Sequence, residues 1–406
     1  MTTLAERPTD SLRGNRDFTW LWTGTGLSFL ASQVSAYAYP LIVLWTTGSA
    51  SAAGLVAFAA QLPYVVSQLP AGLVVDRLDR RHLMVFCDIG RATVIATIPI
   101  LWIVGAISPW YLAAAGFVEG TLTVLYRIAE RAALPSVVTK AQLPAAIGRN
   151  EARERAAGLL GQPTAGVLAA LTNWAPFLFT AVAHLVSLGT LLMIKSDMRA
   201  SRSTKDSHPW RDVCEGFAWM WRRPFVRTAV GLIAVSNLLF QVMMLLILVL
   251  VRDGGGSTAS AAVVSAVAGA GGVLGAVNGP RFAKRMSLAT AVIGANALFT
   301  VLVAMVAFVR HPVGLGVVFA ATAFVGAVWT VAITAHLYEI VPGEMMGRVA
   351  SIATLMAYGP IAFGSLLGGF VIEELGATGT VWVCAGVMAV LTALAALSPS
   401  VRNTGS

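Results

Sequence analysis

Long apolar segments recur along the chain, separated by short polar stretches. A helix that crosses the ~30 Å hydrocarbon core of a bilayer needs about 20 residues. Twelve segments reach that length, near residues 18–45, 54–75, 83–104, 110–131, 147–171, 176–194, 225–251, 258–279, 288–309, 313–336, 349–372 and 379–398. Barrel strands would instead be about 10 residues long with alternating polarity. The pattern therefore predicts an all-α membrane protein with twelve transmembrane helices.

The longest polar stretch, residues 195–223, divides these segments into two groups of six. We expect five regions: a cytoplasmic tail over 1–17, a six-helix half over 18–195, a cytoplasmic linker over 196–224, a second six-helix half over 225–398 and a tail over 399–406. Apolar residues at helical spacing near the end of the linker favour an amphipathic helix on the membrane surface, and a solvated linker is the alternative. These residues are Val213, Phe217, Met220 and Trp221. Two halves of six helices are typical of a transporter with a site between them.

The composition agrees with a membrane environment. Of the 406 residues, 57% are hydrophobic and only 12% are charged, whereas soluble domains carry about 25% charged residues. A cytosolic enzyme and a secreted disulfide scaffold are excluded, and the three cysteines lie too far apart to indicate a disulfide framework or a metal site. With a cytoplasmic amino terminus, all Lys and Arg except Arg252 and Arg310 fall on the cytoplasmic side. The positive-inside rule therefore places both termini there, and the net charge of +9 is assigned to anionic lipid headgroups rather than to nucleic acid.

A distinctive loop follows the second predicted span, and it contains Gly72, Asp76, Arg77, Arg80 and Arg81. The glycine permits close helix approach, and the acid lies where a helix leaves the bilayer, among basic side chains. Together with the twelve-span layout, this loop resembles the signature loop of the major facilitator superfamily of transporters. The resemblance implies that these residues form a latch that holds the two halves together in the outward-facing state.

Other stretches extend the resemblance over almost the whole chain. Asp79 stands where the usual loop has glycine, and this variant is similar to the drug-efflux branch that includes macrolide and siderophore exporters. Further similar stretches are residues 18–22 with 38–41, 62–64, 88–92, 341–342 and 347–348. The corresponding loop of the second half has Gly279 in place of the acid, so this copy of the motif is degenerate.

One acid, Glu119, lies about nine residues into its span, ~14 Å from the end and near the midplane. Tyr126 and Glu130 follow on the same helical face, flanked by Arg127. Acids at this depth are functional by default. A carboxyl group that burial keeps protonated, and that an approaching cation deprotonates, is what a proton-coupled carrier needs. We therefore assign proton coupling to Glu119, Arg127 and Glu130.

Two alternatives to this assignment stay open. The Glu119 carboxyl group can be a hydrogen-bonded group that only fixes helix packing. Arg127 or Arg131 can pair with Glu151 or Glu154 of the next span. The first predicted span has no carboxylate in its middle. Glu119 is therefore the candidate for proton coupling.

The fifth span contains Gly161, Pro163 and Gly166, and this run resembles the antiporter motif of the family. Small residues and a proline bend are compatible with a gate, although plain helix packing explains them as well. Six polar residues inside spans are candidates for a central cavity: Gln33, Tyr37, Tyr126, Asn237, Gln241 and Tyr358. Each of them alone is also explained by an interhelical hydrogen bond.

No phosphate-binding loop, nucleophile triad or metal-ligand spacing occurs, so we expect neither an enzyme nor a cofactor. An ion gradient must then supply the energy. We expect a monomeric secondary transporter that exports a small amphipathic drug or natural product across the cytoplasmic membrane in exchange for protons, with lipids as its surroundings. The dense use of Ala and Gly is typical of a GC-rich bacterial genome. The alternatives are an importer on the same fold, a phospholipid flippase, and a membrane sensor or scaffold without transport.

Overall fold

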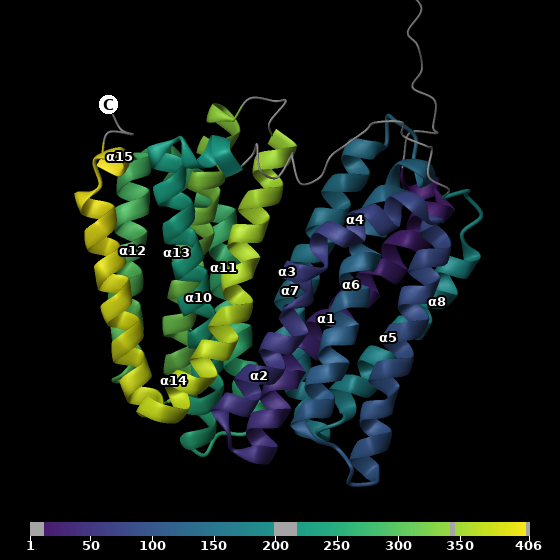
Figure 1. Ribbon diagram of the computed structural model, residues 1–406, viewed down its shortest axis with the longest axis horizontal. Helices are drawn as coiled ribbons and strands as arrows, with labels where there is room; N and C mark the ends of the chain where they lie inside the picture. The colour runs from purple at the N-terminus through teal and green to yellow at the C-terminus, as the bar shows by residue number, and fades with distance from the viewer. Residues whose placement is uncertain (1–11, 199–216, 310, 342–345, 403–406) are drawn as a thin grey trace, which may run out of the picture.

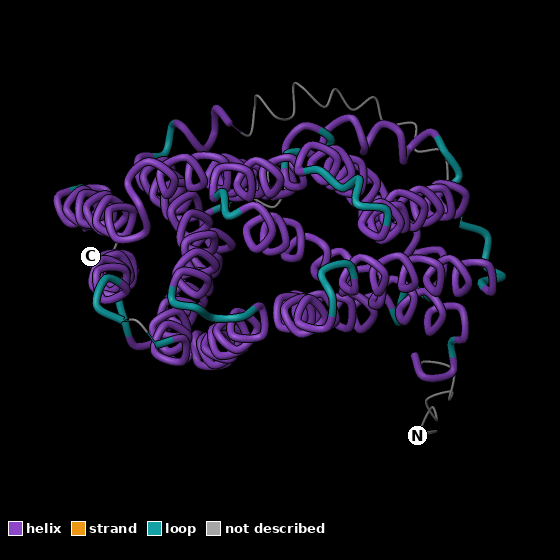
Figure 2. The backbone as a smooth tube through the Cα atoms, turned by 90° about the horizontal axis from the view of Figure 1, so that it is seen from below, coloured by secondary structure: helices purple, strands orange, loops and turns teal. Residues whose placement is uncertain are grey.

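The computed structural model describes residues 12–198, 217–309, 311–341 and 346–402, and in these ranges every regular element is helical (Figures 1 and 2). A short 3₁₀ turn, Leu12–Gly14, precedes the first helix. The α-helices are α1 (Arg16–Thr47), α2 (Ala50–Gln61), α3 (Pro63–Val66), α4 (Gln68–Arg77), α5 (Arg80–Ile103), α6 (Pro109–Val137), α7 (Leu143–Leu171), α8 (Ala175–Met193), α10 (Pro224–Asp253), α11 (Thr258–Arg285), α12 (Leu288–Val306), α13 (Pro312–Ile340), α14 (Met346–Leu397) and α15 (Pro399–Arg402).

Nine helices of the described ranges are long and apolar enough to cross a membrane. The remaining predicted spans also have helical counterparts. The second span is divided into α2, α3 and α4, with Pro63 at the start of α3, and the fifth corresponds to α7. The last two predicted spans correspond to the two helical parts of α14, which are separated by the non-helical Gly376 with φ 69° and ψ 172°. The predicted all-helical membrane fold is confirmed.

The linker helix is described only in its last part. Residues 217–221 are helical, Phe217 stacks on Trp221 with ring centroids 5.5 Å apart, and Met220 is buried. Val213 lies outside the described residues. The amphipathic helix over the whole segment therefore stays a prediction.

The helices form two bundles, which we call the N-terminal bundle (α1–α8) and the C-terminal bundle (α10–α15) (Figure 1). Within the first, α1 packs on α7 and α8, and α5 packs on α6 and α8. Within the second, α11 packs on α13, and α14 packs on α10 and α12. The bundles meet where α2 packs on α14, α7 on α11 and α1 on α10.

The closest contacts between the bundles lie on one side of the molecule. We call the side on which α1 begins and α15 ends the terminal face, and the opposite side the far face. Near the far face, a Cβ atom at Gly54 of α2 would lie only 2.9 Å from the Cα atom of Gly369 of α14. There the Glu373 carboxylate of α14 accepts a hydrogen bond of 3.1 Å from the Ser51 backbone N–H and one of 3.3 Å from Ser49 Oγ. Figure 1 shows α2 against the bend of α14 at this end. The molecule is thus closed on its far face.

Candidate functional site

A short segment of α1 carries polar side chains on two opposite faces. Because a helix turns every 3.6 residues, Ser35 and Tyr39 share one face, and Gln33 and Tyr37 share another. Ser35 and Tyr39 point into the N-terminal bundle, where both contact Glu119. Gln33 and Tyr37 border a pocket between the two bundles. This segment of α1 therefore contacts Glu119 on one face and lines the pocket between the bundles on the other.

Glu119 of α6 is buried within the N-terminal bundle, with 4% of its surface exposed. Its Oε1 accepts a 2.6 Å hydrogen bond from Ser35 Oγ, and its Oε2 accepts a 3.0 Å hydrogen bond from the Tyr39 hydroxyl. A buried carboxyl group is tolerated when such donors are present. Since both donors come from α1, the surroundings of the Glu119 carboxyl group depend on how α1 lies against α6.

His184 of α8 lies between Glu119 and a second carboxyl group. Its Nε2 is 3.9 Å from Glu119 Oε1, and its Nδ1 is 3.7 Å from Asp88 Oδ1 and 3.3 Å from Ser28 Oγ. The ring is fully buried, and Nε2 has no hydrogen-bond partner among the described residues. A small displacement would bring this nitrogen into hydrogen-bond contact with Glu119.

Asp88 and Arg91 of α5 complete the buried network. Arg91 Nη2 donates to Asp88 Oδ1 at 2.6 Å, and Ser187 Oγ donates to Asp88 Oδ2 at 2.8 Å. The Arg91 guanidinium carbon lies 4.2 Å from the ring centroid of Tyr126, and the Tyr126 hydroxyl is 3.0 Å from Ser187 Oγ. Tyr126, a predicted cavity residue, is thus buried inside the N-terminal bundle, where its ring lies against the Arg91 guanidinium.

Three members of this network were not predicted as site residues: Asp88, Arg91 and His184. Each is an ionisable residue within a predicted span, 83–104 or 176–194. This position alone could have marked all three as candidate site residues. Asp88 and Arg91 entered the prediction only through the family resemblance. The structure brings all three together because α5 and α8 pack on each other.

Arg127 does not neighbour Glu119 in this structure. Eight residues of helix separate the two, a rise of about 12 Å. Arg127 Nη2 instead pairs with Glu154 Oε2 of α7 at 2.8 Å, and its guanidinium carbon lies 4.8 Å from the ring centroid of Phe29. The expected approach of Arg127 to Glu119 is therefore replaced by the alternative pairing with α7.

Glu130 also pairs with α7. Arg153 Nη2 lies 2.8 Å from Glu130 Oε1, and Asn150 Nδ2 donates to the same oxygen at 3.3 Å. Arg153 also donates to Thr25 of α1. This buried ion pair therefore ties α6, α7 and α1 together.

The Glu130–Arg153 pair gives a stability prediction. Arg153→Met is expected to lower the free energy of unfolding by about 3–5 kcal/mol, because it leaves the Glu130 carboxylate buried without its cation. Adding Glu130→Gln removes that charge, so the double variant is expected to be more stable than the single one. Thermal unfolding of the detergent-solubilised proteins measures the difference. A double variant that unfolds no later than Arg153→Met would contradict the prediction.

A pocket of about 190 Å³ lies between the bundles. Its polar lining comes from both bundles and consists of Gln33, Tyr37, Gln61, Gln162, Gln241 and Ser365. Gln61 Nε2 donates to Ser365 Oγ across the interface at 3.4 Å. The Tyr37 hydroxyl lies 2.8 Å from Ser265 Oγ of α11. The four amide side chains supply donors and acceptors without a net charge.

The predicted cavity residues are therefore divided among several places. Gln33, Tyr37 and Gln241 meet in the pocket between the bundles, whereas Asn237 borders a second cavity within the C-terminal bundle. The side chain of Tyr358 lies outside the described residues.

The glycines of α7 stand at close helix contacts. A Cβ atom at Gly161 would overlap the side chain of Gln33 in α1, and one at Gly166 would lie 2.5 Å from the Cβ atom of Ala262 in α11. Pro163 lies inside α7 between these two contacts. Close packing thus explains the two glycines, and a gate at this position stays a prediction.

The predicted latch residues lie in α4 and at the start of α5. A Cβ atom at Gly72 would meet no atom of the described residues within 4 Å, so none of these residues packs closely against it in this conformation. Arg77 is exposed, and Arg81 Nη2 donates to the Leu192 carbonyl of α8 at 3.0 Å. Arg80 Nε is buried and has no hydrogen-bond partner in the described part of the chain. The side chain of Asp76 lies outside the described residues, and the latch stays a prediction.

Comparisons with known proteins agree with this architecture. A family model described as Major Facilitator Superfamily matches residues 21–360. The chain is 25% identical over 385 residues to the multidrug efflux pump Tap of Mycolicibacterium fortuitum, with 91% of this chain and 92% of that protein covered. It is 27% identical over 379 residues to Tap of Mycobacterium tuberculosis, with 88% of each covered. It is 24% identical over 151 residues, 37% of each chain, to macrolide efflux protein A of Streptococcus pyogenes.

Solved structures show the same fold. The nucleoside transporter NupG superposes with a TM-score of 0.73 at 12% identity, covering 94% of this chain and 98% of that one. A bacterial homologue of the iron transporter ferroportin in an inward-facing state gives a TM-score of 0.72 at 14% identity, covering 98% and 100%.

Proposed function

The chain belongs to the major facilitator superfamily, and from this premise we propose that it exports a small amphipathic drug or natural product from a bacterial cell in exchange for protons. It is a membrane transporter and not an enzyme. The direction of transport is supported by relatives that are named multidrug efflux pumps and match about nine-tenths of the chain. A shorter match to a macrolide efflux protein points the same way.

One observation carries the coupling to protons: the same segment of α1 serves both the Glu119 network and the pocket between the bundles. Ser35 and Tyr39 donate hydrogen bonds to Glu119, while Gln33 and Tyr37, on neighbouring positions, line the pocket. Any rearrangement of the bundles that displaces α1 therefore changes the hydrogen bonds of the Glu119 carboxyl group.

In the proposed cycle, these hydrogen bonds govern when Glu119 holds its proton. Donors to both oxygens stabilise a carboxylate, and burial without donors favours the protonated group. In the present conformation, closed on the far face, Ser35 and Tyr39 both donate to the carboxyl group. In the proposed cycle, this is the conformation that gives up the proton and loads cargo. When the far face opens, displacement of α1 withdraws the donors, and Glu119 takes up a proton. His184 lies where it can pass that proton between Glu119 and Asp88.

Dye export from intact cells tests the proposed function. Cells that express the chain are loaded with Nile red, a neutral lipophilic dye, and its loss is followed by fluorescence after energy is restored. We expect faster loss than in cells with an empty vector, and we expect a protonophore to remove the difference. Equal rates in both strains would contradict export, and export that resists the protonophore would contradict proton exchange.

A further inference from the structure

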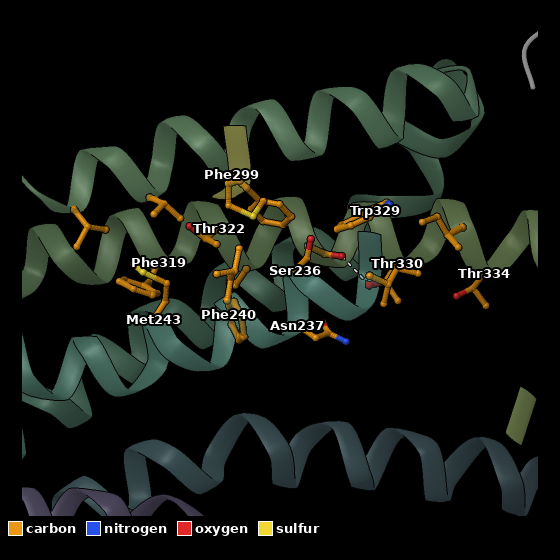
Figure 3. A pocket seen from close by; sticks show the side chains of 18 residues that line it. Ser236, Asn237, Phe240, Met243, Phe299, Phe319, Thr322, Trp329, Thr330 and Thr334 are labelled. Carbon is orange, nitrogen blue, oxygen red and sulfur yellow. Dashed lines mark hydrogen bonds between the residues drawn. The ribbon is translucent and has the colours of Figure 1, made fainter. Parts of the chain in front are cut away.

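The C-terminal bundle contains a second, partly open cavity, which Asn237 borders and to which the proposed function assigns no role. Its volume is about 480 Å³, and α10, α12, α13 and α14 line it (Figure 3). Binding sites for small ligands typically measure about 300–1,000 Å³. The cavity shares no lining residue with the pocket between the bundles.

The walls of this cavity are mainly apolar and aromatic. Phe240 comes from α10, Phe299 from α12, and Phe319 and Trp329 from α13. The rings of Phe299 and Trp329 lie 5.9 Å apart between centroids, at an angle of 56°. Figure 3 shows these rings around one space. Such walls are complementary to a flat aromatic ligand.

Two buried polar groups of the wall have no protein partner. Ser236, 8% exposed, and Trp329, 6% exposed, both line the cavity. Neither Ser236 Oγ nor Trp329 Nε1 has a hydrogen-bond partner among the described residues. Buried polar groups are nearly always hydrogen-bonded in native proteins, so a missing partner requires an explanation. An indole N–H can only donate, which means that the missing partner of Trp329 carries an acceptor atom.

The charge of the ligand also follows from the lining. None of the described residues that line the cavity is Asp, Glu, Lys, Arg or His. A charged ligand would lose its hydration without gaining a counter-ion, which is strongly unfavourable. The more exposed polar residues of the lining are Asn237, which is half-buried, and Thr330 and Thr334, which are exposed.

We propose that this cavity in the C-terminal bundle is a cargo-binding site for an uncharged aromatic molecule that carries a hydrogen-bond acceptor. The cargo role rests on the proposed export function, whereas binding itself does not. A lipid acyl chain would fill the apolar volume but would leave Trp329 Nε1 and Ser236 Oγ unpaired. The two unpaired groups therefore favour a cargo with polar atoms.

Three ligands with a similar tricyclic frame test the proposal. 9-Fluorenone has a carbonyl acceptor, fluorene has none, and 10-methylacridinium carries a positive charge. Radiolabelled ligands are bound to the purified protein in nanodiscs and measured by scintillation proximity, with empty nanodiscs as background. We expect 9-fluorenone to bind most tightly, and 10-methylacridinium at least about 100-fold more weakly, because of its buried charge.

Variants at the two unpaired groups give the decisive comparison. Trp329→Phe keeps an aromatic ring but removes the N–H group, and Ser236→Ala removes a single oxygen atom. Each is expected to weaken 9-fluorenone about 5- to 10-fold, the contribution of one hydrogen bond, and to leave fluorene unchanged. Trp382→Phe is the matched control, because Trp382 is 50% exposed and lies outside the cavity lining. Retained fluorene binding also shows that each variant is folded.

The outcomes separate the proposal from its rivals. Equal binding of 9-fluorenone and fluorene to the wild type and both variants would indicate a purely apolar filling, such as an acyl chain, and would overturn the proposal. Tighter binding of 10-methylacridinium than of 9-fluorenone would overturn it as well. Because the measurement uses no gradient, failed Nile red export with intact 9-fluorenone selectivity would contradict the export function and leave the binding site standing.

Discussion

Glu119→Gln is expected to abolish proton-driven export. The amide resembles the protonated carboxyl group in shape but cannot release a proton. The exchange cycle therefore stops at the step in which Glu119 would release its proton. In everted vesicles with an imposed pH gradient, transport of Nile red should fall to the rate of vesicles that lack the protein. Binding of cargo should persist, because Glu119 lies in the N-terminal bundle and lines neither cavity.

The matched control for this variant is Glu374→Gln, which makes the same chemical change at an exposed position of α14. It is expected to transport like the wild type. If Glu119→Gln retains a pH-dependent rate, the carboxyl group is only a packing element held by Ser35 and Tyr39. The alternative reading of Glu119 as a structural group would then be correct.

Gly54→Leu is expected to prevent closure of the far face. A Cβ atom at Gly54 would lie 2.5 Å from the Ser365 carbonyl oxygen and 2.9 Å from Gly369 Cα. Both are backbone atoms of α14, which cannot turn aside as a side chain can, so the strain is relieved only by separating α2 from α14. Overpacking of this kind costs about 1–3 kcal/mol or more. That free energy is enough to shift a nearly balanced conformational equilibrium, and transport should be lost.

Labelling of a single cysteine measures this shift. Ala53 is fully buried in α2, so Ala53→Cys should react slowly with a membrane-impermeant maleimide in the present conformation and faster when Gly54→Leu is added. Gly231→Leu is the control, because a Cβ atom at Gly231 would meet no atom within 4 Å among the residues that the structure describes. Unchanged labelling with normal transport would show that the α2–α14 contact does not govern access.

The helices could be predicted because hydropathy is a local property of the chain. The break inside the second predicted span could not be predicted so well, because it depends on a single residue: Pro63 begins a new helix there. The separation of the last two spans was predicted, and the non-helical Gly376 lies in the gap between them.

The candidate site was predictable in part for a related reason. Glu119 stood out as the one acid near the middle of a span, and helical spacing placed Tyr126 and Glu130 on its face. Its partners Ser35, Tyr39 and His184 come from other helices, so only tertiary packing identifies them. The cavity of the C-terminal bundle was missed because its walls are common core residues from four helices.

The Glu373 carboxylate has a consequence for the reversibility of the transport cycle. It occupies the amino end of α2, where backbone N–H groups lack partners within their own helix. Glu373 and the Ser49–Ser51 turn lie at the rim of the molecule, so water can replace each partner as they separate. Parting them therefore leaves no buried orphan group behind, unlike the rupture of an ion pair in the interior. This contact can form and break repeatedly with little difference in free energy between its two states. A carrier that alternates between the two sides of a membrane requires such a contact.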